Sequence, residues 1–265
     1  MFKELELSDQ DFSAIAKIVH ENLGIVLGEH KKNMVYRRLS KRIIELGMDT
    51  FGQYVTYLSN NDNEFSTLAN AITTNLTSFF REGHHFEHLK DYIEEHIQRK
   101  NSLRIWSAGC SNGPEPYSIA MVLDSVLSGK GHYDAKILAT DIDTNMLSEG
   151  SEGVYTEEWG MKIPSEYRKY ATVRDGKCII DESLKKYISF KKLNLLHDWP
   201  ISKKFDIIFC RNVVIYFDKP TQKIIFDKFA DLTEDNGYLY IGHSENIMSV
   251  CKRFESCGKT IYRKI

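Results

Sequence analysis

Two carboxylates follow apolar runs in the second half of the chain, where a bound ligand would meet them. Glu115 lies in "RIWSAGCSNGPEPYSIAM", residues 104–121, in which an apolar run passes through two glycines into an apolar helical segment. This order resembles a phosphate-binding loop, but a carboxylate at the start of the helix repels a phosphate. Asp141 ends the run "KILATD". An acidic residue at such a position commonly accepts hydrogen bonds from ribose hydroxyls.

The charge of Glu115 selects among nucleotide-like cofactors. It favours a ligand with ribose and adenine, no phosphate, and positive charge on an ammonium and a sulfonium, which describes S-adenosylmethionine. The alternative for Glu115 is a place in the first helical turn, where acidic residues are favoured in any protein. The alternative for Asp141, or for Asp143, is to cap the helical segment "NMLSEG".

These carboxylates are positioned by short apolar runs that alternate with helical segments from about residue 100. The runs are "LRIWSA", "AKILATD", "ISFKKLNLL", "FDIIFC" and "GYLYIGH". Strands of this kind with helices between them predict a doubly wound α/β domain with a mostly parallel sheet. Ligands of such sheets lie beyond the carboxyl ends of the strands. The sequence places there residues 109–115, Asp141, Asn194, Leu195, Arg211, Asn212 and residues 243–245.

Two segments depart from this pattern. Residues 1–74 are predicted to form a small all-helical N-terminal domain, in which Thr50-x-x-Gln53 and Asn61-x-x-Glu64 resemble capping boxes. Residues 75–265 then form the α/β domain. From about 154 to 188 the α/β pattern is interrupted by a polar and aromatic stretch, too long for an ordinary connection. We predict a small inserted subdomain there.

Composition limits the possible partners. The chain has 265 residues, 42% of them apolar, and a formal net charge of −2, so we expect no nucleic-acid partner. Five cysteines without a C-x-x-C pair suggest neither a disulfide framework nor a zinc site. The sequence shows no secretion signal and no run of membrane-spanning length. We therefore expect a cytoplasmic protein that does not insert into a membrane.

A family resemblance rests on motifs that occur in order from residue 73 onward. They are "TTNLTSFFRE", "RIWSAGCSNGPEPYSIAM", "ILATDID", "LNLL", "FDIIFCRNVVIYFDK" and "YIGHSEN". Together they resemble the CheR-type chemotaxis receptor methyltransferases. The resemblance implies a fold of the S-adenosylmethionine-dependent methyltransferase type, with a helical N-terminal domain for receptor recognition and an inserted β-subdomain. It also implies methylation of glutamate side chains on chemoreceptor cytoplasmic helices, which gives glutamate methyl esters and S-adenosylhomocysteine.

The resemblance also implies roles for individual residues. Arg81 and Tyr216 would lie nearest the transferred methyl, and we expect them to orient the acceptor carboxylate and to fix its second oxygen or the methyl donor. Arg81 could instead contact the cofactor carboxylate or form an ion pair with Glu82 or Glu87, and Tyr216 could be a core aromatic. Around the cofactor the resemblance places Asn75, Thr77, Arg81, Glu115, Asp141, Asn194, Leu195, Arg211 and Asn212, and Gly109 lets the chain pass close to the ligand.

The cofactor loop departs from the family pattern at two positions. Family members commonly have "STGEEPYS" where this chain has "SNGPEPYS", so Asn112 and Pro114 replace a threonine and a glutamate while Glu115 is kept. Proline is tolerated in the first turn of a helix, because the N–H it lacks would have no partner there. Neither change removes a group with an assigned role.

A basic segment and a histidine cluster remain. In "EHKKNMVYRRLSKRI" helical geometry puts Lys31, Arg37, Arg38, Lys41 and Arg42 within an arc of about 140°. We predict that they bind acidic receptor helices; the alternative is an ordinary solvated face. Of His84, His85 and His88, only the first and last share a helical face, and the sequence offers no acidic or cysteine partner of matching spacing. We therefore predict no metal site.

The leading hypothesis is a protein-glutamate O-methyltransferase. A glutamate carboxylate is already ionised at neutral pH, so its attack on a methyl group requires no general base. One alternative is a regulator that binds S-adenosylmethionine without turnover, and another is a methyltransferase of the same fold that acts on a small molecule. We expect a monomer. In some family members the inserted subdomain docks on a peptide tether at the receptor's C-terminus, and the sequence leaves this open.

Overall fold

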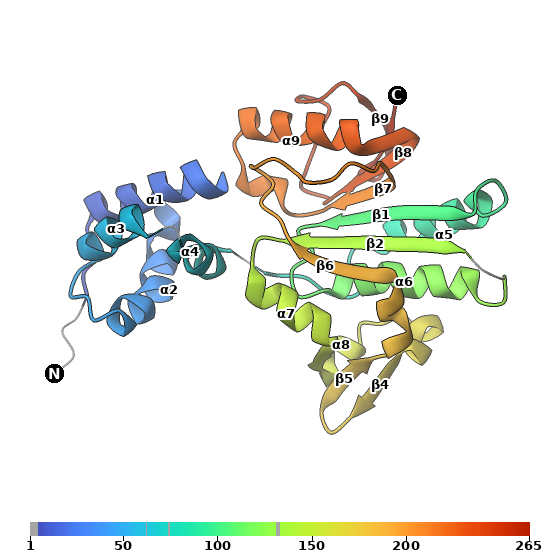
Figure 1. The fold of residues 1–265 in the computed structure, drawn as a ribbon, viewed down its shortest axis with the longest axis horizontal. Coiled ribbons are helices and arrows are strands. Elements are labelled where there is room, and N and C mark those ends of the chain that lie inside the picture. The colour runs from blue at the N-terminus through green and yellow to red at the C-terminus, as the bar shows by residue number, and fades with distance from the viewer. Residues whose placement is uncertain (1–4, 62, 74, 131–132) are drawn as a thin grey trace.

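The computed structural model describes residues 5–61, 63–73, 75–130 and 133–265, so residue 74, where the sequence places the domain boundary, lies outside the described residues. Four helices at the N-terminus form a bundle beside the rest of the chain (Figure 1). They are α1 (Asp9–Leu23), α2 (Lys32–Glu45), α3 (Phe51–Asn60) and α4 (Glu64–Ile72), with the short 3-10 helix η1 (Glu29–Lys31) before α2.

Local signals determine where α1 begins and ends. The Ser8 hydroxyl accepts a hydrogen bond from the Asp11 backbone N–H at 3.0 Å. Gly24 ends the helix in the left-handed conformation, with φ of +69°, and its N–H donates to the His20 carbonyl oxygen. A residue with a Cβ is strained in this conformation, so glycine is favoured after the last helical turn.

Of the two predicted capping boxes, the first forms its hydroxyl bond but its glutamine binds the residue before the N-cap, and the second is wrong. The Thr50 hydroxyl accepts from the Gln53 N–H at 3.2 Å, and the Gln53 side chain accepts from the Asp49 N–H. By contrast, α4 begins at Glu64 itself, and its N-cap residue makes no side-chain cap bond. The Glu64 carboxylate is buried in the bundle and pairs with Arg42. A buried ion pair has therefore replaced the helix cap.

In the described part of the chain, the central sheet has seven strands in the order β6-β2-β1-β7-β8-β10-β9. The first five are parallel and correspond to the five predicted runs, whereas β10 is antiparallel to both its neighbours. β9 and β10 were not predicted from the sequence. The strands are β1 (Ser102–Ala108), β2 (Asp134–Asp141), β6 (Ile188–Lys192), β7 (Phe205–Cys210), β8 (Thr233–Ile241), β9 (Phe254–Gly258) and β10 (Ile261–Lys264).

Helices cover both faces of this sheet, which confirms the doubly wound α/β fold. Leu103 and Ile105 of β1 belong to the core cluster formed with α5 (His84–His96) and α6 (Pro114–Leu127). Trp106 and Ala108 belong to the cluster formed with α9 (Lys219–Leu232). Strands buried on both faces carry near-continuous apolar runs, as parallel sheets require.

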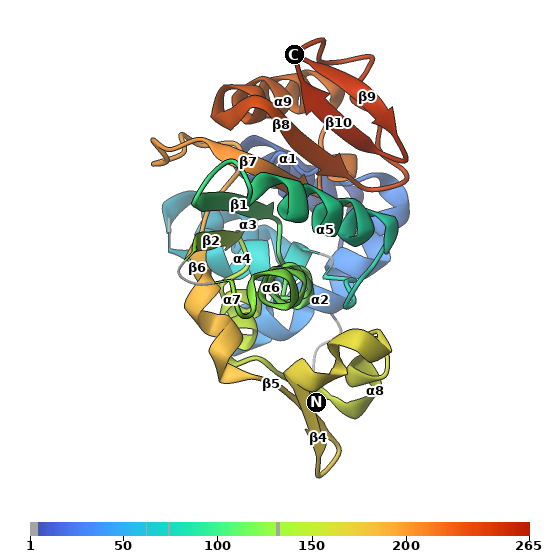
Figure 2. The same cartoon turned by 90° about the vertical axis from the view of Figure 1, so that its right-hand side faces the viewer.

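The inserted subdomain lies between α7 (Thr144–Glu152) and β6. Its three-stranded antiparallel sheet has the order β3-β5-β4, from β3 (Val154–Thr156), β4 (Ala171–Arg174) and β5 (Lys177–Ile180). Short helices complete it: α8 (Glu157–Gly160), η2 (Ser165–Tyr170) and η3 (Glu182–Tyr187). Figure 2 shows the subdomain at the opposite end of the molecule from β9 and β10. Within the described residues, no helix is long and apolar enough to cross a membrane.

Candidate active site

A pocket lies where the carboxyl ends of β1, β2 and β7 meet the helical bundle. The strand order reverses between β1 and β7, and such a switch point is where open α/β sheets bind ligands. In Figure 1 the arrowheads of β1 and β2 point toward the bundle. The pocket is lined by every residue that the resemblance assigned to the cofactor or the methyl: Asn75, Thr77, Arg81, Gly109, Glu115, Asp141, Asn194, Leu195, Arg211, Asn212 and Tyr216.

The loop between β1 and α6 forms one wall of the pocket. Gly109 has φ of +80°, and a Cβ on it would lie 2.3 Å from the Val213 side chain, so no other residue fits. The Ser111 N–H donates to the Asp141 carboxylate at 2.8 Å, which ties the loop to the end of β2. Pro114 is the first residue of α6, where proline is tolerated as expected.

Asp141 and Asp143 have different tasks. Asp143 caps α7 by accepting from two backbone N–H groups at 3.0 and 3.2 Å. Asp141 is buried, accepts from the Ser111 and Asp143 N–H groups, and lines the pocket. Burial raises the pKa of the Asp141 carboxyl and outweighs these backbone hydrogen bonds. Each carboxylate oxygen still has a lone pair for a ligand hydroxyl.

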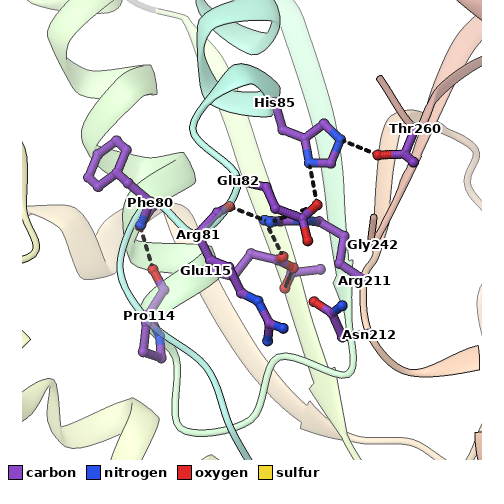
Figure 3. Close-up of polar contacts among 12 residues, drawn as sticks. Phe80, Arg81, Glu82, His85, Pro114, Glu115, Arg211, Asn212, Gly242 and Thr260 are labelled. Atoms are coloured by element: carbon purple, nitrogen blue, oxygen red, sulfur yellow. Dashed lines mark hydrogen bonds and ion pairs between the residues drawn. The ribbon is translucent and has the colours of Figure 1, made fainter. Parts of the chain in front are cut away.

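The buried Arg211 guanidinium forms an ion pair with the Glu115 carboxylate (Figure 3). The Arg211 side chain is 3% exposed, and its Nη1 lies 3.1 Å from Glu115 Oε2. Its Nη2 lies 3.5 Å from Glu82 Oε2 and donates to the Arg81 carbonyl oxygen. The Ser107 hydroxyl donates to the other oxygen of Glu115 at 2.6 Å. Burial raises the pKa of Glu115, and the nearby Arg211 charge opposes this rise.

Arg81 and Tyr216 both face the pocket. The Arg81 guanidinium donates to the Leu76 carbonyl oxygen at 2.8 Å and points away from Glu82 in Figure 3. Within the described residues Arg81 forms no ion pair with Glu82 or Glu87; Glu82 instead pairs with other side chains. Tyr216 is half-buried and lines the pocket rather than packing in the core. The geometry therefore leaves the Arg81 guanidinium and the Tyr216 phenol available to a ligand.

The other residues that the resemblance assigned to the cofactor are held by contacts between segments. The Asn75 amide donates to the Asp143 carboxylate at 3.0 Å, and Thr77 lies half-buried on the same pocket wall. The Asn194 amide donates to the Asn22 carbonyl oxygen of α1 at 2.9 Å, next to the buried Leu195. Contacts between the bundle and the α/β domain thus form part of the pocket wall.

Glu245 has a structural role that sequence patterns do not reveal. Its buried carboxylate accepts four backbone N–H groups. One oxygen binds the N–H groups of Asn212 at 3.0 Å and Gly242 at 2.5 Å, and the other binds those of Val213 at 3.0 Å and Ile215 at 3.3 Å. Glu245 therefore shapes the loop that carries Asn212 and Tyr216. "HSE" at the end of a strand was the only sequence signal, and it did not reveal the partners.

Strained backbone conformations occur in the pocket wall and in the turn before α5. Phe80, Glu82, Ser111 and Asn212 all have φ between +50° and +59°, which residues other than glycine seldom adopt. Such conformations persist where surrounding contacts enforce them, as they do at many functional sites. Asn212 shows this well, since its N–H is bound by Glu245 and its side chain packs on Gly242.

The residues of the predicted basic surface fall into two groups, those with internal contacts and those that remain available to a partner. Arg38 and Arg42 make internal contacts. The Arg42 guanidinium binds the buried Glu64 carboxylate through two bonds of 2.8 and 2.6 Å. The Arg38 guanidinium donates to the last carbonyl oxygens of α4 and the residue after it, those of Ala71, Ile72 and Thr73. These two arginines fasten α2 to α4, which a helical projection of α2 alone does not reveal.

Lys31, Arg37 and Lys41 remain available to a partner. Arg37 and Lys41 are exposed on α2, and Lys41 has one weak pair with Glu45 at 3.8 Å. Lys31 lies at the end of η1 and lines the pocket. The face that can meet an acidic helix is therefore smaller than the sequence predicted.

The histidine cluster has an acidic neighbour, Glu82, that was not predicted from residue spacing. Glu82, His84 and His85 place possible ligand atoms within 4.8 Å of one another, so the statement that no acidic partner matches was wrong. However, the Arg211 guanidinium also lies beside Glu82, and its positive charge would repel a metal ion. The His84 Nε2 is bound to the Lys259 carbonyl oxygen at 2.9 Å. These contacts describe an internal polar network.

His85 makes stability depend on pH. Its Nε2 lies 3.2 Å from the Lys259 carbonyl oxygen, so this nitrogen carries the proton, and its buried Nδ1 faces Glu82 at 3.6 Å. Burial lowers the pKa of His85 to about 3, and the nearby Arg211 charge adds to this effect. Since the unfolded chain keeps a pKa near 6.5, it binds the extra proton first as pH falls. The free energy of unfolding should therefore decrease as the pH falls from about 6.5 to about 3.

We expect His85→Gln to flatten this dependence, because glutamine keeps the Nε2 donor but does not titrate. For one proton, the free energy of unfolding changes by at most about 1.4 kcal/mol per pH unit. Urea unfolding at pH 7, 6 and 5 measures the slope. His30→Gln, at an exposed residue, is the matched control. An equal slope in the wild type and His85→Gln would show that His85 is not the titrating group.

The pocket suits a ligand with hydroxyl, amine and adenine groups. The Ser111 hydroxyl lines it and is buried without a hydrogen-bond partner among the described residues. Asp141 offers acceptor lone pairs, and apolar side chains such as Leu195 and Ile142 provide surfaces for an aromatic ring. These donors and acceptors are those that S-adenosylmethionine requires.

Comparisons with known proteins agree with this geometry. The family model described as the SAM binding domain of CheR methyltransferase matches residues 75–263, and the model for its all-alpha domain matches residues 10–73. A chemotaxis protein methyltransferase of Salmonella typhimurium is 40% identical, over 99% of this chain and 92% of the relative. One from Borreliella burgdorferi is 42% identical over 98% and 96%. One from Pseudomonas aeruginosa is 40% identical over 98% and 95%.

Proposed function

This chain belongs to the CheR methyltransferase family, and we propose that it transfers the methyl group of S-adenosylmethionine to glutamate side chains on chemoreceptor cytoplasmic helices. The products are glutamate methyl esters and S-adenosylhomocysteine. The observation that carries the proposal is Arg81, whose guanidinium faces the pocket without an internal carboxylate partner among the described residues. A cation in that position suits an incoming carboxylate.

We assign the cofactor to the pocket residues by their chemistry. Asp141 accepts hydrogen bonds from the ribose hydroxyls, and Glu115 with Asn75 and Thr77 faces the polar methionine end. Asn194 and Leu195 lie on the wall that receives adenine. When bound, S-adenosylmethionine supplies a methyl group on a positively charged sulfur.

In this proposal Arg81 orients the glutamate carboxylate, and the Tyr216 hydroxyl binds its second oxygen or the donor. The carboxylate is ionised already, so the chain needs to supply no base and mainly fixes the line of attack. Attack neutralises the carboxylate and sulfonium charges. A dry pocket therefore favours the reaction over the separated ions.

We expect Tyr216→Phe to lower kcat by about tenfold, the loss of one hydrogen bond of about 1.4 kcal/mol. The ring and its packing are kept, so binding of S-adenosylhomocysteine should be unchanged. Steady-state methylation and calorimetry measure the two quantities. An unchanged kcat would remove Tyr216 from the reaction.

The basic residues that remain available on α2 are proposed to attract the acidic receptor helix. We expect Arg37→Glu with Lys41→Glu to raise the KM for receptor about fivefold at low salt, and less at high salt, because exposed charges are screened. Lys17→Glu, on the exposed face of α1, is the control. Arg38 and Arg42 are unsuitable for this test since their substitution disturbs the bundle. A KM that stays constant at all salt concentrations would contradict a docking role.

One assay distinguishes the candidate functions. The protein is incubated with radiolabelled S-adenosylmethionine and chemoreceptor-containing membranes, and base-labile methyl esters are counted. Labelled receptor supports the proposal. Cofactor binding without label on any protein indicates a regulator, and label on a small molecule indicates another acceptor. Calorimetry with receptor tail peptides tests separately whether the inserted subdomain binds a tether.

A further inference from the structure

Two exposed apolar side chains line the pocket, and a third belongs to the residue that directly precedes Tyr216. Leu76 is 79% exposed, Val26 53% and Ile215 45%. Leu76 and Val26 line the same pocket as Arg81 and Tyr216. Ile215 directly precedes Tyr216 in η4 (Val214–Tyr216). We call Val26, Leu76 and Ile215 the apolar rim.

Backbone contacts hold the rim next to the two proposed catalytic side chains. The Val26 N–H donates to the Tyr216 carbonyl oxygen at 2.9 Å, so the segment after α1 lies against η4. On the other side, the Leu76 carbonyl oxygen accepts from the Arg81 guanidinium at 2.8 Å. The rim therefore has a fixed position relative to the reacting carboxylate.

Single exposed apolar residues are common on protein surfaces and need no explanation. The rim differs because Leu76 and Val26 line the same pocket and Ile215 adjoins that pocket through Tyr216. Leu76 is the clearest case, since it is 79% exposed between Asn75 and Thr77, which are both half-buried. Covering these side chains with an apolar partner removes their surface from water, which is favourable.

We propose that the apolar rim contacts apolar side chains of the acceptor helix one turn before and after the glutamate that is methylated. This inference rests on the proposed function. A glutamate side chain is short, so for its carboxylate to reach Arg81 the acceptor helix must lie across the mouth of the pocket. Residues three and four positions away lie on the same helical face, about 5–6 Å from the glutamate. They are the ones that meet the rim.

The charges around the rim agree with this occupant. Lys31 and Arg81 line the pocket beneath it, and Arg37 and Lys41 are exposed on α2. An acidic residue in an apolar setting complements the Arg81 and Lys31 cations and the apolar side chains beside them. If lysines lay three or four positions from the glutamate, their charges would be repelled by the basic residues, and the apolar rim would stay exposed to water. The rim thus selects which glutamates are methylated.

The test compares Leu76→Ser and Val26→Ser with Ile224→Ser. Ile224 is 58% exposed on α9 and does not line the pocket, which makes it a matched control. KM for chemoreceptor-containing membranes, kcat and the Kd of S-adenosylhomocysteine are measured for each. We expect each rim variant to raise KM about three- to tenfold, through lost apolar contact. The Kd of S-adenosylhomocysteine should stay within about twofold of the wild-type value in both rim variants. All three constants of Ile224→Ser should also stay within about twofold of the wild type. Leu76→Met, which keeps an apolar side chain, should have the wild-type KM.

Two results would overturn the rim. KM could stay at the wild-type value in both rim variants, or the Kd of S-adenosylhomocysteine could rise in parallel with KM, which would assign these side chains to the cofactor. Failure of the proposed function looks different, because the wild type itself would then form no methyl esters on receptor. Thermal unfolding of each variant verifies that the fold is intact.

Discussion

Replacing Arg81 with methionine is expected to lower kcat/KM for receptor methylation by about 10²- to 10³-fold, as does removal of a charged donor aimed at reacting oxygens. The reason is geometric. Among the described residues, the guanidinium donates one hydrogen bond, to the Leu76 carbonyl oxygen, and otherwise faces the pocket. Stability should therefore change little. Receptor methylation with radiolabelled cofactor measures the first quantity, and thermal unfolding measures the second.

Arg81→Lys is the matched variant, since it keeps the charge but not the planar pair of donors. We expect it to recover part of the lost kcat/KM. The Kd of S-adenosylhomocysteine separates the two roles that remain for Arg81. If that affinity falls as far as kcat/KM in Arg81→Met, the guanidinium binds the cofactor and does not orient the acceptor carboxylate.

Patterns within short segments of sequence predicted most of the fold. The five parallel strands were found because apolar runs end at polar residues, and a parallel sheet buries such runs on both faces. Ser8 and Gly24 bound α1 through contacts within a few residues. The pocket followed too, since the carboxyl ends of parallel strands meet at one edge. Family motifs then specified which side chains line it.

Contacts between distant segments could not be predicted in this way. A helical projection of α2 groups Arg38 with Arg37, yet only the packing of α4 shows that Arg38 binds carbonyl oxygens. Glu64 looked like part of a helix cap because the buried position opposite Arg42 is not visible in sequence. Spacing alone also missed Glu82 beside His85, since the turn before α5 has a positive φ at Glu82.

Glu245→Gln is expected to lower both stability and methylation. The carboxylate accepts four backbone N–H groups, two on each oxygen. In Glu245→Gln, the side-chain NH2 group would replace one oxygen and face two backbone N–H groups, which cannot accept a hydrogen bond from it. Loss of two hydrogen bonds to a charged group costs about 3–6 kcal/mol, less any relaxation of the loop. We expect a marked fall in the free energy of unfolding and a fall in kcat of at least about tenfold, as Asn212 and Tyr216 lose their fixed position.

If Glu245 had a purely structural role, Glu245→Gln would lower stability but the molecules that remain folded would be fully active. Both kcat and hydrogen exchange must therefore be measured at a temperature well below the unfolding transition. There, hydrogen exchange of the Asn212, Val213 and Ile215 amides should be faster in Glu245→Gln, while that of β1 amides is unchanged. Glu255→Gln, which breaks an exposed pair with Arg263, controls for loss of charge. Normal kcat with loosened amides would mean that the loop need not be held for methyl transfer. Reduced kcat with loosened amides identifies Glu245 as a positioning residue, acting through the backbone that carries Tyr216.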